Sequence, residues 1–328
     1  MDKQIETYKD IKNWKESEIQ NHISDTVSLN SFHDEVMKAV FSLALKKMNK
    51  EPPCRFSWFI TGSGGRREQG LISDQDHGII YEIENSECAG YFSSLGEKLA
   101  DGLNISGYPY CDGNVMASNP LWTKSIAKWE EQLAYWLKEE SWATIRSLQI
   151  FYDGRSLIGD EEYIQHLKCY IHQSIQHNPN LLKRLLENVR HIKNSIGPLG
   201  QILTEETGTY KGSINLKYTA FIPYVNGVRL LALKEGIEDT STNGRMEALI
   251  MKSPYNEDLH KYIESFKQLL TYRLLLMNDV ESYDDAHHLF IKDLNKEKKN
   301  EIKKILKNGK RLHQYVANLI EQGVKSWL

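Results

Sequence analysis

Residues 60–81 read ITGSGGRREQGLISDQDHGIIY, and this stretch decides the fold. Arg55–Thr61, which leads into it, is rich in aromatic and β-branched residues and predicts a buried strand. Gly62–Gly65 predicts a tight turn, and Ser73–Glu82 predicts the next strand. The predicted centre of the chain is therefore a strand, a glycine turn and a second strand.

The glycine turn has the composition of a phosphate-binding loop. Gly62 and Gly64 let the backbone approach a bulky anion and point its N–H groups toward it. The Ser63 hydroxyl can donate to a phosphate oxygen, and Arg66 and Arg67 add positive charge at the same place. The turn is not a Walker A loop, since no Gly-Lys-Ser/Thr follows, and it lacks the third glycine of a dinucleotide-binding fingerprint.

Two carboxylates on the second predicted strand indicate a metal site. Residues two apart on a strand point to the same face, so Asp74 and Asp76 are expected side by side. Such a pair repels itself unless a cation binds it, and Mg²⁺ is commonly held by one or two carboxylates plus substrate phosphates. Mn²⁺ is the alternative ion. A site with two metal ions usually has a third carboxylate. We predict that Asp153 supplies it, at the end of an expected strand over Arg146–Asp153.

The composition is that of an ordinary globular protein. The 328 residues allow about two domains, and 40% of them are apolar and 26% charged. No apolar stretch approaches the roughly 18 residues of a membrane span. The charged N-terminus lacks the apolar segment of a signal peptide, so we expect a cytoplasmic location. The net charge of −3 argues against nucleic acid as a partner.

Charge and periodicity change near residue 160. Residues 1–160 carry 17 basic and 24 acidic side chains, whereas residues 161–328 carry 24 and 20. Apolar residues at helical spacing predict helices over residues 1–50, with Ser31 capping the second of them. Strand signals end near residue 160. We therefore expect an α+β protein: a helical segment at 1–50, a domain with strands and helices at 51–160 and a helical bundle at 161–328.

Several reactive residue types receive a structural interpretation. The spacing of Cys54, Cys88, Cys111 and Cys169 predicts buried reduced thiols and no zinc site. A less favoured alternative places Cys111–Asn114 beside the triphosphate. His33-Asp34 is expected on a helix surface, and His287-His288 at a solvated helix start, with metal binding as its alternative.

The stretch GSGGRREQGLISDQD resembles the nucleotidyltransferase superfamily that includes kanamycin nucleotidyltransferase and DNA polymerase beta. It is more similar to the N-terminal domain of bacterial PII uridylyltransferases, with Gly-x-Gly-Arg-x-Glu and Ser-Asp-x-Asp. The similarity to a group of signal-transduction nucleotidyltransferases covers nearly the whole chain. It includes Tyr108–Trp122, Phe151–Asp160 and Gly212–Ala232.

The resemblance implies a small mixed sheet with helices, followed by a helical substrate-binding domain. Arg66 and Glu68 match the Arg and Glu of the motif and would brace the loop as an ion pair or touch phosphate. The other residues implied are Gly62 and Ser63 for the phosphates, Asp74, Asp76 and Asp153 for Mg²⁺, and Lys217 and Arg229 for the cleft side of the helical domain.

The expected function is a Mg²⁺-dependent transfer of UMP or AMP. The donor would be UTP or ATP, and the acceptor a hydroxyl of a protein or small molecule. Two alternatives stay open. One is a small-molecule transferase of the aminoglycoside kind, and the other is a regulatory module that binds nucleotide without turning it over.

Overall fold

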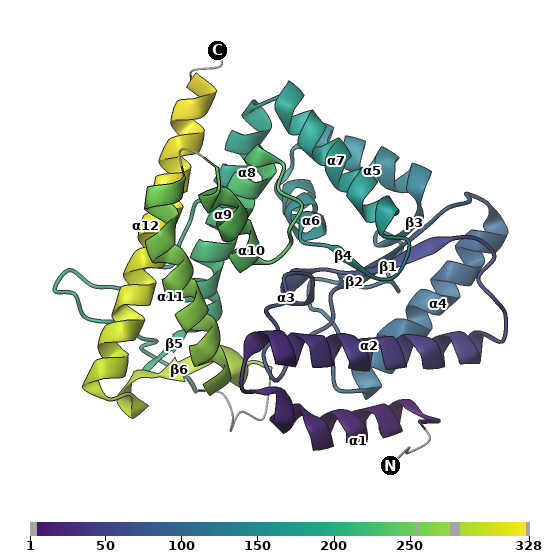
Figure 1. The fold of residues 1–328 in the computed structure, drawn as a ribbon, viewed down its shortest axis with the longest axis horizontal. Coiled ribbons are helices and arrows are strands. Elements are labelled where there is room, and N and C mark those ends of the chain that lie inside the picture. Colours follow the sequence, from purple (N-terminus) through teal and green to yellow (C-terminus); the bar gives the residue numbers. More distant parts are fainter. Residues whose placement is uncertain (1–4, 253–254, 276–282, 326–328) are drawn as a thin grey trace. The chain divides into compact units, whose positions relative to one another are not determined.

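The computed structural model describes residues 5–252, 255–275 and 283–325 (Figure 1). The chain divides into two compact units, Met1–Ile171 and His172–Leu328. Helix α7 (Glu161–His177) carries the chain from the first unit into the second. The sequence placed this division near residue 160, where α7 begins.

A mixed four-stranded sheet, in the order β3-β2-β1-β4, lies at the centre of the first unit. Its strands are β1 (Phe56–Ile60), β2 (His77–Tyr81), β3 (Thr123–Ser125) and β4 (Arg155–Gly159). Strand β1 runs antiparallel to both β2 and β4, and β2 runs parallel to β3. The strand expected at Arg55–Thr61 is confirmed. The strand expected at Ser73–Glu82 begins only at His77, so both aspartates of the expected metal pair precede it.

Alternating side chains of β1 bury the two faces of the sheet against different helices. Trp58 stacks on Phe41 of α2, whereas Phe59 packs edge-on against Trp129 of α5 and Phe151 of α6. Figure 1 accordingly shows helices on both sides of the sheet. The helices on the Trp58 side are α2 (Thr26–Met48) and α4 (Ser86–Ile105); those on the Phe59 side are α5 (Ile126–Glu139) and α6 (Trp142–Tyr152).

The strand predicted at Arg146–Asp153 is wrong, because this segment lies in helix α6 and its C-cap. Ser141 caps the helix by accepting from the Thr144 amide. The buried side chains Ile145, Leu148 and Tyr152 recur at helical spacing. The strand that does pair with β1 is β4, which starts two residues beyond Asp153.

The N-terminal segment is helical, as expected. Helix α1 (Tyr8–Glu18) and a 3₁₀ turn, η1 (Ile19–His22), precede α2. The N-cap of α2 is Asp25, whose carboxylate accepts from the amides of Val27 and Ser28. The cap predicted at Ser31 is therefore wrong, since Ser31 lies inside the helix.

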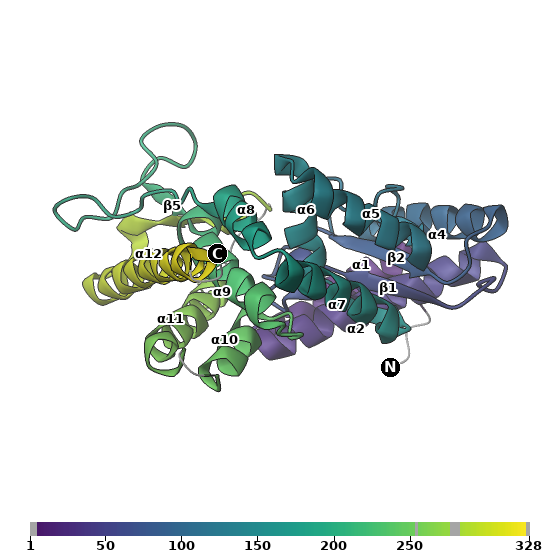
Figure 2. The same ribbon diagram turned by 90° about the horizontal axis from the view of Figure 1, so that it is seen from above.

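The second unit is mostly helical, and three of its described helices, α8, α10 and α12, pack against α9 (Figure 2). The helices are α8 (Asn180–Val189), α9 (Ile222–Glu235), α10 (Thr242–Ile250), α11 (Asn256–Leu275) and α12 (Lys296–Lys325). A two-stranded pair, β5 (Ser213–Asn215) and β6 (His288–Phe290), completes the unit, with a π-helical turn, η2 (Lys217–Phe221), and short 3₁₀ turns, η3 (Asp285–His287) and η4 (Ile291–Asp293). The helix start expected at His287-His288 is wrong, since these residues lie in η3 and β6. The expected α+β class with a helical C-terminal domain is confirmed.

In the parts of the chain that the structure describes, no helix combines the length and the hydrophobicity that crossing a bilayer requires.

Candidate nucleotidyl-transfer site

The antiparallel register of β1 and β2 brings the glycine turn beside the aspartates. Ile60, the last residue of β1, lies opposite His77, the first residue of β2. Residues just after β1 therefore lie next to residues just before β2. The Thr61 amide extends the pairing by donating to the Asp76 carbonyl at 2.9 Å. Antiparallel pairing of β1 with β2 therefore places the turn that follows β1 beside the carboxylates that precede β2.

The turn itself is a single helical turn, α3 (Gly62–Gly65). Gly62 adopts a φ of +57°, in the left-handed region that glycine enters without strain. A Cβ atom on Gly62 would lie 2.0 Å from Oδ2 of Asp76. A Cβ atom on Gly65 would lie 2.1 Å from the Asp153 carbonyl oxygen. Gly62 and Gly65 must therefore be glycine, because neighbouring atoms leave no space for a side chain at either position.

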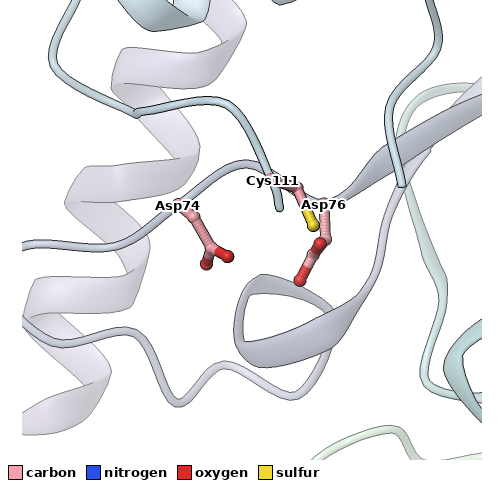
Figure 3. A group of neighbouring side chains, drawn as sticks. All are labelled: Asp74, Asp76 and Cys111. Carbon is pink, nitrogen blue, oxygen red and sulfur yellow. The ribbon is translucent and has the colours of Figure 1, made fainter. Parts of the chain in front are cut away.

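Asp74 and Asp76 lie close enough to share a cation. Ligand atoms of Asp74, Asp76 and Cys111 all lie within 4.8 Å of one another, and all three residues are partly exposed. Figure 3 shows the two carboxylates pointing toward a common space, with the sulfur of Cys111 beside Asp76. The two carboxylates fit a hard cation such as Mg²⁺, which takes oxygen ligands. The side-by-side placement expected for a strand is retained in the segment before β2.

Cys111, the third member of this group, lies in the irregular segment between α4 and β3. That segment runs along the start of β2, where the Gln75 amide donates to Pro109 and the His77 amide donates to Val115. Burial, together with the charge and hydrogen bond of Asp76, raises the pKa of the Cys111 thiol to about 12. At neutral pH the thiol is therefore protonated and donates to Asp76.

The sequence assigned Cys111 to the buried thiols and gave its place beside the triphosphate only as an alternative. The free cysteines differ in exposure: Cys88 is buried, Cys54 and Cys111 are intermediate, and Cys169 is exposed. A uniform set of buried thiols is therefore wrong. The one available signal in the sequence was the composition of the segment Cys111–Asn114 (CDGN), which is polar and contains a glycine.

Ser63 and Gly64 occupy the same turn with more room around them. The Ser63 hydroxyl lies 3.2 Å from the Ser73 hydroxyl, and a Cβ on Gly64 would meet its neighbours at an ordinary 3.5 Å. The Gly64 carbonyl accepts from the Arg155 guanidinium at 3.1 Å. Ser63 thus connects the turn to the residue immediately before Asp74.

Arg66 forms a buried ion pair network with two carboxylates. Its Nε lies 2.8 Å from Oε2 of Glu68, and its Nη1 lies 2.8 Å from Oδ2 of Asp153. Burial opposes the charge, but Glu68 and Asp153 outweigh it and raise the pKa of Arg66. Of the two roles expected for Arg66 and Glu68, the structure shows the brace. The network fixes the loop that leaves α3.

Asp153 is not brought into the metal-ligand group. Among the described residues, the group of carboxylate and thiol ligands within 4.8 Å contains Cys111 and not Asp153. The Asp153 side chain is 1% exposed and accepts from Arg66. Asp153 is the C-cap residue of α6 rather than part of the expected strand, and it pairs with Arg66 there. The structure thus corrects its expected position beside Asp74 and Asp76.

Arg67 points its guanidinium outward from the loop. The Arg67 backbone has a φ of +56°, and its side chain is 54% exposed. Its Nη1 lies 3.6 Å from Oδ2 of Asp34. Asp34 also pairs with Arg155 at 2.6 Å. A half-exposed guanidinium beside the turn is compatible with the predicted contact to a phosphate.

One polar face of α2 anchors the loop after α3. The Asn30 carboxamide accepts from the Gln69 amide, a ring nitrogen of His33 bonds the Gly70 carbonyl, and Asp34 pairs with Arg155. Residues 30, 33 and 34 share a helix face at this spacing. His33 and Asp34 are both buried, so the surface position expected for this dipeptide is wrong.

The two basic residues expected from the second unit differ in exposure. Lys217 begins the π-helical turn η2 and is half-buried, and its Nζ donates to the Tyr283 hydroxyl at 3.3 Å. Arg229 on α9 is buried and donates to Asn226 at 2.8 Å. Arg229 therefore has a bond inside the helical unit, whereas Lys217 keeps contact with solvent.

Comparisons with known families agree with this division of the chain. Residues 17–142 match the family model described as "Putative nucleotidyltransferase DUF294". Residues 179–320 match the model described as "Putative nucleotidyltransferase substrate binding domain". No curated protein matches the chain. The similarity to PII uridylyltransferases stays a prediction. Over these two regions, the chain belongs to the DUF294 family of putative nucleotidyltransferases and carries its C-terminal substrate-binding domain.

Proposed function

We propose that this protein transfers a nucleoside monophosphate from UTP or ATP to a hydroxyl group of a protein or small molecule. The observation that carries the proposal is the convergence of Asp74, Asp76 and the Gly62 turn. Gly62, which has no room for a side chain, lies against Asp76, and ligand atoms of Asp76 and Asp74 lie within 4.8 Å of each other. Phosphate binding and charge neutralisation are thereby available within one short segment.

In this proposal Asp74 and Asp76 hold a divalent cation, Mg²⁺ or Mn²⁺. Such an ion neutralises phosphate charge and lowers the pKa of a bound hydroxyl, which is worth several kcal/mol in comparable sites. The Cys111 thiol donates to Asp76 and so holds this carboxylate in place. Both aspartates are proposed as the catalytic carboxylates.

The glycine turn and its arginines are proposed to bind the triphosphate. The backbone amides of Gly62, Ser63 and Gly64 would donate to phosphate oxygens, because the first amides of a helical turn have no acceptor within it. Arg67 would add a charge-assisted bond from its half-exposed guanidinium. Arg66 is held by Glu68 and Asp153 and is proposed to shape the loop rather than to touch phosphate.

The transfer is an in-line displacement at the α-phosphorus. The acceptor oxygen forms a bond to that phosphorus while the bond from the α-phosphorus to the bridging oxygen of the β-phosphate breaks. The acceptor proton is released to solvent, and pyrophosphate leaves. Lys217 and Arg229 are proposed as further contacts to the nucleotide from the substrate-binding domain, with Lys217 the better placed by exposure.

One observation favours the second candidate, a nucleotide-binding regulatory module. The metal-ligand group in the described residues has two carboxylates and a thiol, without the third carboxylate that a two-metal site would use. Binding requires fewer ligands than turnover. The two candidates differ in whether the α-phosphoryl group is ever transferred.

Transfer of label from α-³²P-labelled UTP or ATP distinguishes them. The purified chain is incubated with Mg²⁺ or Mn²⁺ and with protein and metabolite extracts, and labelled products and pyrophosphate are measured. A transferase labels an acceptor, and Asp74→Asn or Asp76→Asn lowers the rate about a thousandfold, equivalent to about 4 kcal/mol. The matched control is Asp160→Asn, which removes a partly exposed carboxylate paired with Arg55. Nucleotide binding without any label transfer supports the regulatory module.

A further inference from the structure

The segment that carries the two aspartates alternates in burial. Ser73, Gln75 and His77 are buried, whereas Asp74 and Asp76 between them are partly exposed. Residues two apart in an extended chain share a side, so this is the pattern of a segment with one buried side and one open side. Gln75 therefore points inward, away from the space that the two carboxylates share in Figure 3.

The Gln75 carboxamide is completely buried, and each of its polar groups has a partner. Its Nε2 donates to the Ala100 carbonyl at 3.1 Å and to the Tyr108 carbonyl at 3.0 Å. Its Oε1 lies 2.9 Å from Nε2 of His77. Ala100 lies in α4 and Tyr108 in the segment that follows α4. One side chain thus joins the aspartate segment to two other parts of the first unit.

Trp58 determines the direction of the hydrogen bond between His77 and Gln75. The indole N–H group of Trp58 can only donate, and it lies 3.1 Å from Nδ1 of His77. Nδ1 therefore carries no proton, so the ring is neutral and its proton is on Nε2. This proton is donated to Oε1 of Gln75, and the NH₂ group of Gln75 must then face the two carbonyls.

Backbone hydrogen bonds hold the same segment less completely. The Gln75 amide donates to the Pro109 carbonyl at 3.2 Å, and the Thr61 amide donates to the Asp76 carbonyl at 2.9 Å. Residues 73–76 belong to no helix or strand, so they lack the continuous ladder that keeps β2 in register. The three side-chain bonds of Gln75 supply the additional constraint.

These bonds oppose a change in the side to which each residue points. A shift of the segment by one residue would expose Gln75 and bury a carboxylate in its place. That carboxylate would face two carbonyl oxygens and could not donate to either of them. Burial of a charged group without a partner is unfavourable, so the inward position of Gln75 keeps Asp74 and Asp76 together on the open side.

We propose that Gln75 is a positioning residue for the metal pair. Its buried carboxamide fixes the extended segment so that Asp74 and Asp76 can both reach one divalent cation. Gln75 touches neither the cation nor the nucleotide and acts through its two neighbours. The cation rests on the proposed function, whereas the fixing of the segment does not.

The first experiment measures Mn²⁺ binding to the full chain, wild type and Gln75→Met, by calorimetry. Methionine is close to glutamine in length and volume but makes none of the three side-chain bonds. Mn²⁺ affinity should fall at least tenfold, because the aspartates lose their common position. Urea unfolding of both proteins is measured in parallel, and the titrations are made where both are fully folded.

Ser57→Ala is the matched control. The Ser57 hydroxyl is buried and donates to the Ser156 hydroxyl at 2.9 Å, which joins β1 to β4. Ser57 precedes Trp58 in β1, so its side chain lies on the opposite face of the sheet. This variant should lose stability and keep its Mn²⁺ affinity. If Gln75→Met behaves in the same way, or if both variants weaken Mn²⁺ binding equally, the proposal is overturned.

His77→Phe tests the same constraint from a second residue and decides the matter if Gln75→Met does not fold. Phenylalanine keeps a buried ring but cannot donate to Oε1 of Gln75. We therefore expect weaker Mn²⁺ binding in this variant as well. Unchanged affinity in His77→Phe contradicts the proposal.

Hydrogen exchange in EDTA separates the proposal from the proposed function. Mass spectrometry follows the backbone amides of residues 73–77, with those of β4 as an internal reference. In Gln75→Met the first set should exchange at least tenfold faster than in the wild type, and the second set at the same rate. If the wild type binds no Mn²⁺, the proposed function loses its metal site, while faster exchange still supports the fixing of the segment. Unchanged exchange of residues 73–77 overturns the proposal whether or not Mn²⁺ binds.

Discussion

The backbone of Gly62 and the carboxylate of Asp76 are in such close contact that a Cβ on Gly62 would lie 2.0 Å from Oδ2 and 2.9 Å from Cγ of Asp76. Real Cβ atoms do not approach other atoms so closely. Gly62 also has a φ of +57°, which strains any other residue. The turn and the carboxylate therefore form one steric unit, and a change to either displaces the other.

Gly62→Ala is expected to abolish Mg²⁺-dependent nucleotide binding while the helical second unit remains folded. The added methyl group must push Asp76 out of the position it shares with Asp74. Calorimetric titration with Mn²⁺ and with Mg²⁺ plus UTP or ATP measures the loss. Gly90→Ala is the matched control: its Cβ would meet nothing within 4 Å on α4, so binding should not change. Undiminished metal binding by Gly62→Ala would contradict the steric argument.

Nucleoside triphosphate binding to the proposed site is expected to require Mg²⁺ or Mn²⁺. Without a cation, Asp74 and Asp76 repel the phosphates that the turn would hold. Affinity for UTP or ATP should fall at least tenfold in EDTA, which corresponds to about 1.4 kcal/mol. Equal affinity in EDTA and in Mg²⁺ would remove the metal site from the proposal.

Alkylation of Cys111 is expected to be slow at pH 8 and to accelerate as pH rises. Burial and the neighbouring Asp76 raise the pKa of this thiol to about 12, so the reactive thiolate is on the order of one part in ten thousand at pH 8. Asp76→Asn removes the charge but not the burial, and should raise the rate several-fold. Mass spectrometry after iodoacetamide treatment follows this, with the exposed Cys169 as internal control. An equal rate in both proteins would mean that Asp76 does not act on the thiol.

Local sequence signals identified the parts of the site that depend on neighbouring residues in the chain. The apolar run at β1, the glycines of α3 and the aspartate pair were all found from composition and spacing. Helix α6 was missed because a short apolar segment such as RSLQIFY fits both strand alternation and helical spacing. Its N-cap, Ser141, lies outside the alternating stretch Arg146–Asp153.

The long-range contacts were not predictable in the same way. The brace between Arg66 and Asp153, and the contact of Asn30 with Gln69, join residues that only the folded chain brings together. Their side chains are polar and give no periodic apolar signal. A single sequence does not show which polar residue pairs with which, so the anchoring face of α2 and the brace between Arg66 and Asp153 emerged only from the structure.

Asp153→Asn is expected to lower stability and to leave metal binding intact. Asp153 is buried and its charge balances Arg66, so removing one partner of this buried network should cost about 3 kcal/mol in the free energy of unfolding. Urea unfolding and Mn²⁺ titration measure the two properties separately. Glu68→Gln, which cuts the other arm of the brace, should behave alike. Lost Mn²⁺ binding with unchanged stability would restore Asp153 as the third metal ligand.

Stability near the N-terminus is expected to depend on pH through Lys15. This lysine is 6% exposed, donates to the Gly107 carbonyl at 2.8 Å and lies 3.8 Å above the Tyr108 ring. Burial lowers the pKa of Lys15 from 10.5 to about 7; Glu16 opposes this shift by a smaller amount, and Lys12 adds to it. Between these values the unfolded chain binds a proton that the folded chain does not. Stability should therefore rise with pH across this window, with a limiting slope of about 1.4 kcal/mol per pH unit.

Lys15→Met removes this titration and provides the measurement. Urea unfolding at pH 7, 8 and 9 should show the wild type gaining stability relative to Lys15→Met as pH rises, because methionine has no proton to exclude. The matched control is Lys47→Met, which removes an exposed lysine that lies 3.9 Å above the Tyr8 ring. If the difference between wild type and Lys15→Met is constant over this range, the Gly107 carbonyl and the Tyr108 ring keep the ammonium charged despite its burial.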